Sequence, residues 1–145
     1  MAILDKTGSG VNRLAYRYQA LSEVRAPMAD WLFDRGGRAR ILHDSDKLRN
    51  NQGRVIAWIS GNNVYSLRGR HVGWFEGGVL FDSRNCPIAF ARNRTMGLPS
   101  VPGIGGTPGM PGFAGGPGRP GFGGVPARPG RGGWSQHDVE EYFGA

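Results

Sequence analysis

Apolar and polar positions in the middle of the chain repeat at a step of sixteen residues. A residue that tolerates positive φ marks each step, and a short polar residue stands three positions before it. The first set is Gly37, Gly53, Gly69 and Asn85, and the second set is Asp34, Asn50, Ser66 and Asp82. A polar side chain that accepts backbone N–H groups, followed by an αL residue, is typical of a type I turn with a bulge. The spacing therefore predicts four β-hairpins, one for each turn.

Bulky apolar residues keep the same register on both sides of these turns. Five positions before the turn ends stand Leu32, Leu48, Val64 and Leu80, and five positions after them stand Leu42, Trp58, Trp74 and Phe90. One hairpin cannot bury such a face alone, so we expect four hairpins related by rotation to bury both sets in one shared core. Two positions before the second set, and expected on its face by parity, lie Arg40, Ile56, Val72 and Ile88.

Mostly small residues alternate with these bulky positions. They are Ile41, Ala57, Gly73 and Ala89. Close approach of neighbouring backbones would explain them, and so would a half-exposed strand face. The sequence favours close approach only slightly.

Glycine-containing corners separate successive hairpins. The run GRHVGWFEGGVLFD joins the second strand of the third hairpin to the first strand of the fourth, and its EGG, residues 76–78, is the corner between them. SGNN, residues 60–63, makes the same break one hairpin earlier. The first hairpin is the most degenerate, because Arg40 stands where the others have Ile or Val. As a terminal repeat, this hairpin is expected to pack against a different neighbour from those of the other hairpins.

The repeat carries a resemblance to a known family. The segment RVIAWISGNNVYSLRGRHVGWFEGGVLFDSRNCPIAF resembles the four-fold β-flower family, most specifically in VYSLRGRHVGWFEGGVLFD. The resemblance covers residues 30–94 and departs from the family pattern at Asn85, where a glycine is usual. It implies a mainly β domain of four hairpins arranged like petals about a pseudo-four-fold axis, and it implies no reaction.

The sequence divides into four parts. Residues 1–29 contain an amphipathic helical pattern that we expect to cover one mouth of the β assembly, which occupies residues 30–94. In residues 95–133 glycine and proline dominate, and glycine recurs at every third position from Gly103 to Gly124. Such a segment is either collagen-like or a flexible linker, and the extra glycines favour a disordered linker.

The final residues, 134–145, regain bulky side chains. Ser135 and Asp138 form a capping signal for a short amphipathic C-terminal helix, in which acidic residues suit the first turn. Its apolar residues are Trp134, Val139, Tyr142 and Phe143. A helix this short is ordered only when it is docked, so these four side chains are candidates for contact with a protein partner, with a second copy of the chain, or with the chain's own domain.

The charge of the chain points to polyanions. The formal net charge is +7 and the pI is about 10.5. Arg38, Arg54 and Arg70 occupy one repeat position and are candidate contacts to phosphates of a nucleic acid or an anionic lipid surface. The sequence thus predicts a non-enzymatic binding module, with nucleic-acid or anionic-lipid binding through this basic face as the alternative.

Residue patterns for catalysis are absent from the sequence. His43, His71 and His137 have no metal-ligand spacing, and Cys86 has no local signature of a nucleophile. The repeat register explains Asp34 and Asp82 as turn residues. We expect no enzymatic activity, no cofactor and no metal. No signal peptide or apolar run of membrane-spanning length occurs, so the sequence predicts a soluble, cytoplasmic protein.

Overall fold

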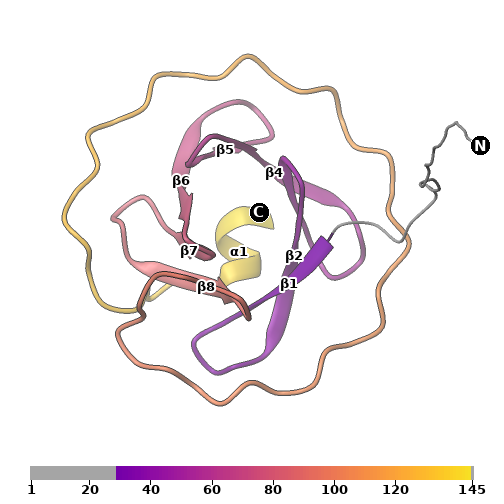
Figure 1. Ribbon diagram of the computed structural model, residues 1–145. Helices are drawn as coiled ribbons and strands as arrows, with labels where there is room; N and C mark the ends of the chain where they lie inside the picture. Colours follow the sequence, from indigo (N-terminus) through magenta and orange to yellow (C-terminus); the bar gives the residue numbers. More distant parts are fainter. Residues whose placement is uncertain (1–28, 145) are drawn as a thin grey trace, which may run out of the picture.

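The computed structural model describes residues 29–144, in which eight strands form one closed antiparallel barrel (Figure 1). Each strand pairs with the next along the chain, and the last pairs with the first. The elements are β1 (Ala29–Phe33), β2 (Ala39–Asp44), β3 (Lys47–Arg49), β4 (Val55–Ser60), β5 (Asn63–Ser66), β6 (His71–Glu76), β7 (Val79–Phe81), β8 (Pro87–Ala91) and α1 (Val139–Gly144). The prediction of a mainly β fold built from consecutive hairpins is confirmed. The predicted N-terminal helix lies outside the described residues.

The four hairpin turns have the geometry that the repeat predicts. Gly37, Gly53, Gly69 and Asn85 all adopt positive φ, between 63° and 87°. In the first turn, the Oδ1 atom of Asp34 accepts hydrogen bonds from the N–H groups of Gly36 and Arg38 at 2.9 and 3.0 Å. Asn50, Ser66 and Asp82 accept the equivalent bonds in their own turns. Each turn is therefore stabilised within its own few residues.

A β-bulge recurs at the base of every turn. In the first hairpin Leu32 pairs with Ile41 while Phe33 pairs with Ala39, so Arg40 is the extra residue on its strand. Its equivalents in the other hairpins are Ile56, Val72 and Ile88. A bulge breaks strict alternation, because two residues of one strand face one residue of the other. The prediction that these residues share a face with the bulky set two positions later is therefore wrong. Ile56 and Ile88 pack instead in the core inside the barrel.

The two bulky sets lie on opposite sides of the barrel wall. Leu32, Leu48, Val64 and Leu80 point inward and are fully buried, together with Val139 and Phe143 of α1. Leu42, Trp58, Trp74 and Phe90 are also buried, but on the outer face of the wall. Of the two bulky sets, only the first therefore contributes to the shared central core. The bulge accounts for the difference, since it shifts the facing of every residue that follows it.

The mostly small residues that precede the second bulky set line the interior of the barrel, where chain segments approach closely. Ile41, Ala57 and Ala89 are completely buried in the inner core. A Cβ atom on Gly73 would overlap the carbonyl oxygen of Phe81 on the neighbouring chain segment. Close backbone approach is therefore the reason for glycine here, and a solvated face is excluded.

A helix from the end of the chain occupies the centre of the barrel in Figure 1. It is α1, which contacts β2 and β4. At the opposite ends of the strands the rings of His43 and Phe75 pack with centroids 4.6 Å apart and planes tilted by 60°. They come from β2 and β6, which stand across the barrel from each other. Among the described residues, the helix that fills the barrel comes from the C-terminal segment, whereas the helix predicted to cover one mouth falls in residues 1–29 and lies outside them.

The Gly/Pro-rich segment encircles the barrel as an ordered strap, which we call the belt (residues 97–133; Figure 1). It has no regular secondary structure, but it donates one backbone hydrogen bond to each hairpin turn. The bonds run from Gly105 to Gly37, from Ala114 to Gly53, from Gly123 to Gly69 and from Gly132 to Asn85, at 2.8 to 3.3 Å. The prediction of a disordered linker is therefore wrong. Because the belt has no regular secondary structure, the turn carbonyls accept hydrogen bonds from four of its backbone N–H groups.

Belt side chains cover the outer apolar face of the wall. The ring of Phe122 stacks on Tyr65 with centroids 4.0 Å apart, and Phe113 lies 4.4 Å from the guanidinium carbon of Arg49. The guanidinium of Arg128 lies 5.2 Å from the centre of the Trp74 ring. These contacts keep the outer bulky set from water, which is why the barrel tolerates large apolar residues on both faces of its wall.

Candidate functional site

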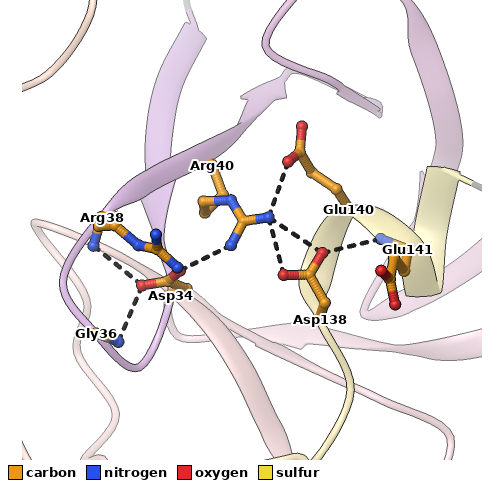
Figure 2. A network of polar contacts seen from close by, with 7 residues as sticks. All are labelled: Asp34, Gly36, Arg38, Arg40, Asp138, Glu140 and Glu141. Carbon is orange, nitrogen blue, oxygen red and sulfur yellow. Dashed lines mark hydrogen bonds and ion pairs between the residues drawn. The ribbon is translucent and has the colours of Figure 1, made fainter.

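An ion-pair network joins the first hairpin to the C-terminal helix (Figure 2). The guanidinium of Arg40 contacts Asp34 at 3.0 Å through one terminal nitrogen and both Asp138 and Glu140 at 2.8 Å through the other. The side chain of Arg40 is only 18% exposed. Because Arg40 occupies the bulge position that is apolar in the other three hairpins, only the first hairpin can make these ion pairs with the helix segment.

All three titrating groups at the centre of this network are held in their charged forms. Burial opposes the charge of Arg40, but hydrogen bonds to Glu140, Asp34 and Asp138 outweigh it and raise its pKa. Burial also raises the pKa of the Asp34 carboxyl, yet bonds from the Arg38 backbone and the Arg40 side chain lower it overall. Asp138 behaves likewise, with the Glu141 N–H and Arg40 lowering its pKa against burial. The network is suited to holding charge and structure, and poorly suited to proton transfer near neutral pH.

A pocket of about 310 Å³ opens beside the network. One wall is the first hairpin turn with the neighbouring Arg40, and the other is the segment 134–138, where the chain passes from the belt into the barrel. The lining side chains that carry charge, amide or ring nitrogen are Asp34, Arg35, Arg38, Arg40, Trp134, Gln136, His137 and Asp138. We call this cavity the Arg40 pocket.

The candidate polyanion contacts are exposed and do not converge on one pocket. Arg38, Arg54 and Arg70 follow the closing glycine of three turns, and Cys86 occupies the fourth position. Arg38 is 76% exposed and lies 3.4 Å from Asp34. Among residues 29–144, no carboxylate lies within 4.0 Å of Arg54 or Arg70. We call these three residues the arginine ring.

The candidate partner contacts at the C-terminus face the chain's own barrel. Val139 and Phe143 are 1% and 7% exposed within the inner core. The hydroxyl of Tyr142 donates to the carbonyl of Val72 at 2.6 Å and accepts from the N–H of Ser83 at 2.8 Å. Trp134 packs on the outer core. Of the three docking alternatives, the structure has the helix on its own domain.

A buried serine completes the attachment of this segment and was not recognised as a contact residue from the sequence. The Ser135 hydroxyl donates to Asp82 at 2.6 Å, and the Ser135 N–H donates to the carbonyl of Pro87 at 2.7 Å. The cap of α1 is Asp138, whose carboxylate accepts the N–H of Glu141. The capping signal at Ser135 thus marked a tertiary anchor, which a local motif cannot distinguish from a cap.

The other residues considered for chemistry have structural surroundings. His71 lies between Tyr65 and Trp74, and burial lowers its pKa. Burial and the charge of Asp82 raise the pKa of Cys86, so its thiol stays protonated. Across residues 29–144, no group of His, Cys, Asp and Glu is placed to hold a metal ion. The same part of the chain has no helix with the length and apolar character needed to cross a membrane.

Comparison with known proteins identifies the repeat. The sequence profile described as 4-fold beta flower protein matches residues 30–143, which include the belt and most of α1 as well as the barrel. No curated protein matches the chain. No solved structure matches it either.

Proposed function

The chain belongs to the 4-fold beta flower proteins, and on that premise we propose that it is a non-enzymatic binding module that holds an anionic membrane surface against its arginine ring. The observation that carries this proposal is the repetition of an exposed arginine at the same position of three turns, Arg38, Arg54 and Arg70. The family match supplies an architecture without a reaction.

The symmetry of the barrel makes the arginine ring suitable for a flat partner. The four hairpins have the same register and the same bulge, so they are related by rotation about the barrel axis. Equivalent residues of such units lie at one height along the axis. A planar surface can therefore touch all three arginines at once, and the attraction of each arginine to anionic headgroups adds to that of the others.

The turns carry further groups suited to a membrane surface. Arg35, Arg68 and Arg84 lie in the first, third and fourth turns and are exposed, and Leu67 at the tip of the third turn is 39% exposed. The acidic side chains at the start of α1 are partly neutralised, because the capping residue Asp138 and Glu140 of the helix both pair with Arg40. A net positive set of turns remains to attract lipid phosphates.

Single-stranded nucleic acid is the less favoured polyanion. Proteins that bind it stack bases on exposed aromatic rings. The large rings of the barrel wall are covered here: Trp58, Tyr65 and Trp74 are 6%, 5% and 3% exposed. Because the positive charge is not accompanied by exposed aromatic rings, a membrane surface with phosphate headgroups is favoured over single-stranded nucleic acid.

Vesicle co-sedimentation tests the proposal. The full chain is mixed with phosphatidylcholine vesicles with and without phosphatidylserine, and with single-stranded RNA. We expect binding to the anionic vesicles only, and the triple variant Arg38→Gln, Arg54→Gln, Arg70→Gln is expected to bind about 100-fold more weakly, since each arginine contributes about 1 kcal/mol.

A charge-matched control separates the ring from net charge. Lys47→Gln, Arg92→Gln and Arg94→Gln remove three positive charges at the opposite ends of the strands, and this variant should retain most of the binding. Equal losses of vesicle binding in the two triple variants would show that binding depends on net charge and not on the arginine ring. Ring-dependent binding of RNA in preference to anionic vesicles would assign the ring to nucleic acid and overturn the membrane proposal.

A further inference from the structure

We propose that the Arg40 pocket is a binding site for a small organic anion that carries a carboxylate or phosphate group on a flat apolar body. This site shares Arg38 with the arginine ring but not Arg54 or Arg70, and a soluble ligand in a pocket needs no membrane surface. The volume of about 310 Å³ is at the lower end of the range for small-molecule sites.

The pocket is a feature of the first hairpin. It forms where the chain leaves the belt at Trp134 and crosses to Val139 inside the barrel, next to the turn 34–37. The other three turns bind the belt through the equivalent backbone bonds, and the fourth is further bonded to Ser135 and Tyr142, but the pocket lies at the first turn. The departure from four-fold symmetry thus creates a concave site at one hairpin, beside three arginines that the turn and the bulge supply.

The acidic groups that line the pocket are already satisfied. Asp34 accepts two backbone N–H groups on one oxygen and the guanidinium groups of Arg38 and Arg40 on the other. Asp138 accepts the guanidinium of Arg40 and the N–H of Glu141. Neither carboxylate is therefore left to repel an incoming anion with its full charge.

Several donors in the pocket remain available. Within the described part of the chain, the side chains of Arg35, Gln136 and His137 form no hydrogen bond, and Arg38 makes only one long bond of 3.4 Å to Asp34. Two guanidinium groups and an amide on facing walls can therefore donate to the oxygens of one carboxylate or phosphate. Such charge-assisted bonds are the strong ones in anion recognition.

The apolar part of the lining explains why the ligand should have a flat apolar body. Trp134 is half-buried, with its indole N–H donating to Ser100 at 2.9 Å and its ring 6.2 Å from that of Phe90. The indole is held in place by these contacts, and Ile88 adds apolar surface to the lining. A planar ring or chain can rest on this wall while its anionic group meets the arginines.

Calorimetric titration of the full chain tests the site with four probes: phenyl phosphate, benzoate, inorganic phosphate and the neutral benzyl alcohol. We expect phenyl phosphate and benzoate to bind, inorganic phosphate to bind more weakly, and benzyl alcohol not to bind. The variant Arg35→Gln, Arg38→Gln should weaken phenyl phosphate about tenfold or more. The matched control Arg54→Gln, Arg70→Gln, which removes the same charge at hairpins without the pocket, should bind as the wild type does.

A second variant tests the flat wall. Trp134→Leu should weaken phenyl phosphate while leaving inorganic phosphate unchanged, and an unchanged thermal midpoint without ligand shows that the fold is intact. Equal losses in the two arginine variants, benzyl alcohol binding as well as benzoate, or no binding of any probe by the wild type would each overturn the proposal. None of these outcomes depends on vesicles, so the pocket and the arginine ring stand or fall separately.

Discussion

The closing glycine of the first turn, Gly37, leaves no room for a Cβ atom, because that atom would overlap the carbonyl oxygen of Gly103 in the belt. The same relationship holds between Gly53 and Gly112 and between Gly69 and Gly121. Each of these turn glycines thus meets two requirements at once, a positive φ and direct backbone contact with the belt. The belt is consequently part of the fold, held at every turn.

Replacing Gly53 by alanine should therefore cost more than positive φ alone. Gly61 provides the matched control, since it also has positive φ, at 61°, but a Cβ atom added to it would meet nothing within 4 Å. We expect Gly61→Ala to lower the free energy of unfolding by about 1 kcal/mol, and Gly53→Ala to lower it by a further 1–3 kcal/mol, roughly the usual cost of overpacking. Urea unfolding of both variants measures the difference. Equal costs would show that the belt does not press on the turn.

The belt should be visible by hydrogen exchange measured by NMR. The N–H groups of Gly105 and Gly123 donate to turn carbonyls at 2.9 and 2.8 Å, so we expect them to exchange more slowly than those of Gly106 and Gly124, for which no such bond exists within the described residues. The contrast between adjacent glycines removes most sequence effects on intrinsic exchange. Uniformly fast exchange along residues 97–133 would show that this segment is a disordered linker after all.

Replacing Arg40 by methionine should release α1 from the barrel wall. The substitution leaves Asp34, Asp138 and Glu140 without their shared cation, and we expect a loss of about 2 kcal/mol or more in the free energy of unfolding, less than for a fully buried network because the helix carboxylates are about a third exposed. Lys47→Met, which breaks a single part-buried pair with Asp46, should cost about 1 kcal/mol or less. Equal effects of the two substitutions would contradict a structural role of the network.

The difference in the free energy of unfolding between wild type and Arg40→Met should depend on pH. Burial opposes the charge of Asp34 and Asp138, but their bonds lower both pKa values overall in the folded state. The stability they contribute is therefore present above the ordinary carboxyl pKa of about 4 and is lost as the pH falls through the folded values. The gap between wild type and Arg40→Met should narrow below about pH 4. A gap that stays constant in acid would show that Arg40 contributes by packing alone.

Truncating Trp74 should be among the most damaging substitutions outside the inner core. Trp74 is 3% exposed, and its ring meets His71 on one side and the guanidinium of Arg128 at 5.2 Å on another. Trp74→Ala should cost about 3–5 kcal/mol, whereas Met110→Ala in an exposed part of the belt should have little effect. Thermal unfolding compares the two. A midpoint for Trp74→Ala within a degree or two of wild type would show that belt and wall do not share a core.

The turns could be predicted from the sequence because their causes are local. A side chain such as Asp34 satisfies N–H groups two and four residues away, and Gly37 supplies the positive φ, so four residues determine the turn wherever they occur. Their repetition at sixteen residues then fixes the number of hairpins and the mainly β class. The same register predicted that Leu32, Leu48, Val64 and Leu80 are buried in a shared core, although it assigned the second bulky set to that core as well.

The belt could have been recognised only in part. Its proline and glycine follow a nine-residue unit that starts at Pro102, Pro111, Pro120 and Pro129, and a match between four such units and four hairpins is present in the sequence. The glycine triplets within each unit hide that longer period. Composition alone indicates disorder, because the segment has no hydrogen-bonding pattern of its own.

The sequence alone determined the four turns, the hairpin count and the unusual residue at Arg40. Tertiary structure decided which side of the wall each bulky set occupies, because a single extra residue at each bulge reverses the facing and leaves no mark in the composition. It also decided the place of α1, since the two partners of Arg40 at this helix, Asp138 and Glu140, are 98 and 100 residues away. Contacts over such separations form only when the closed barrel brings both segments together, so no local pattern encodes the Arg40 pocket.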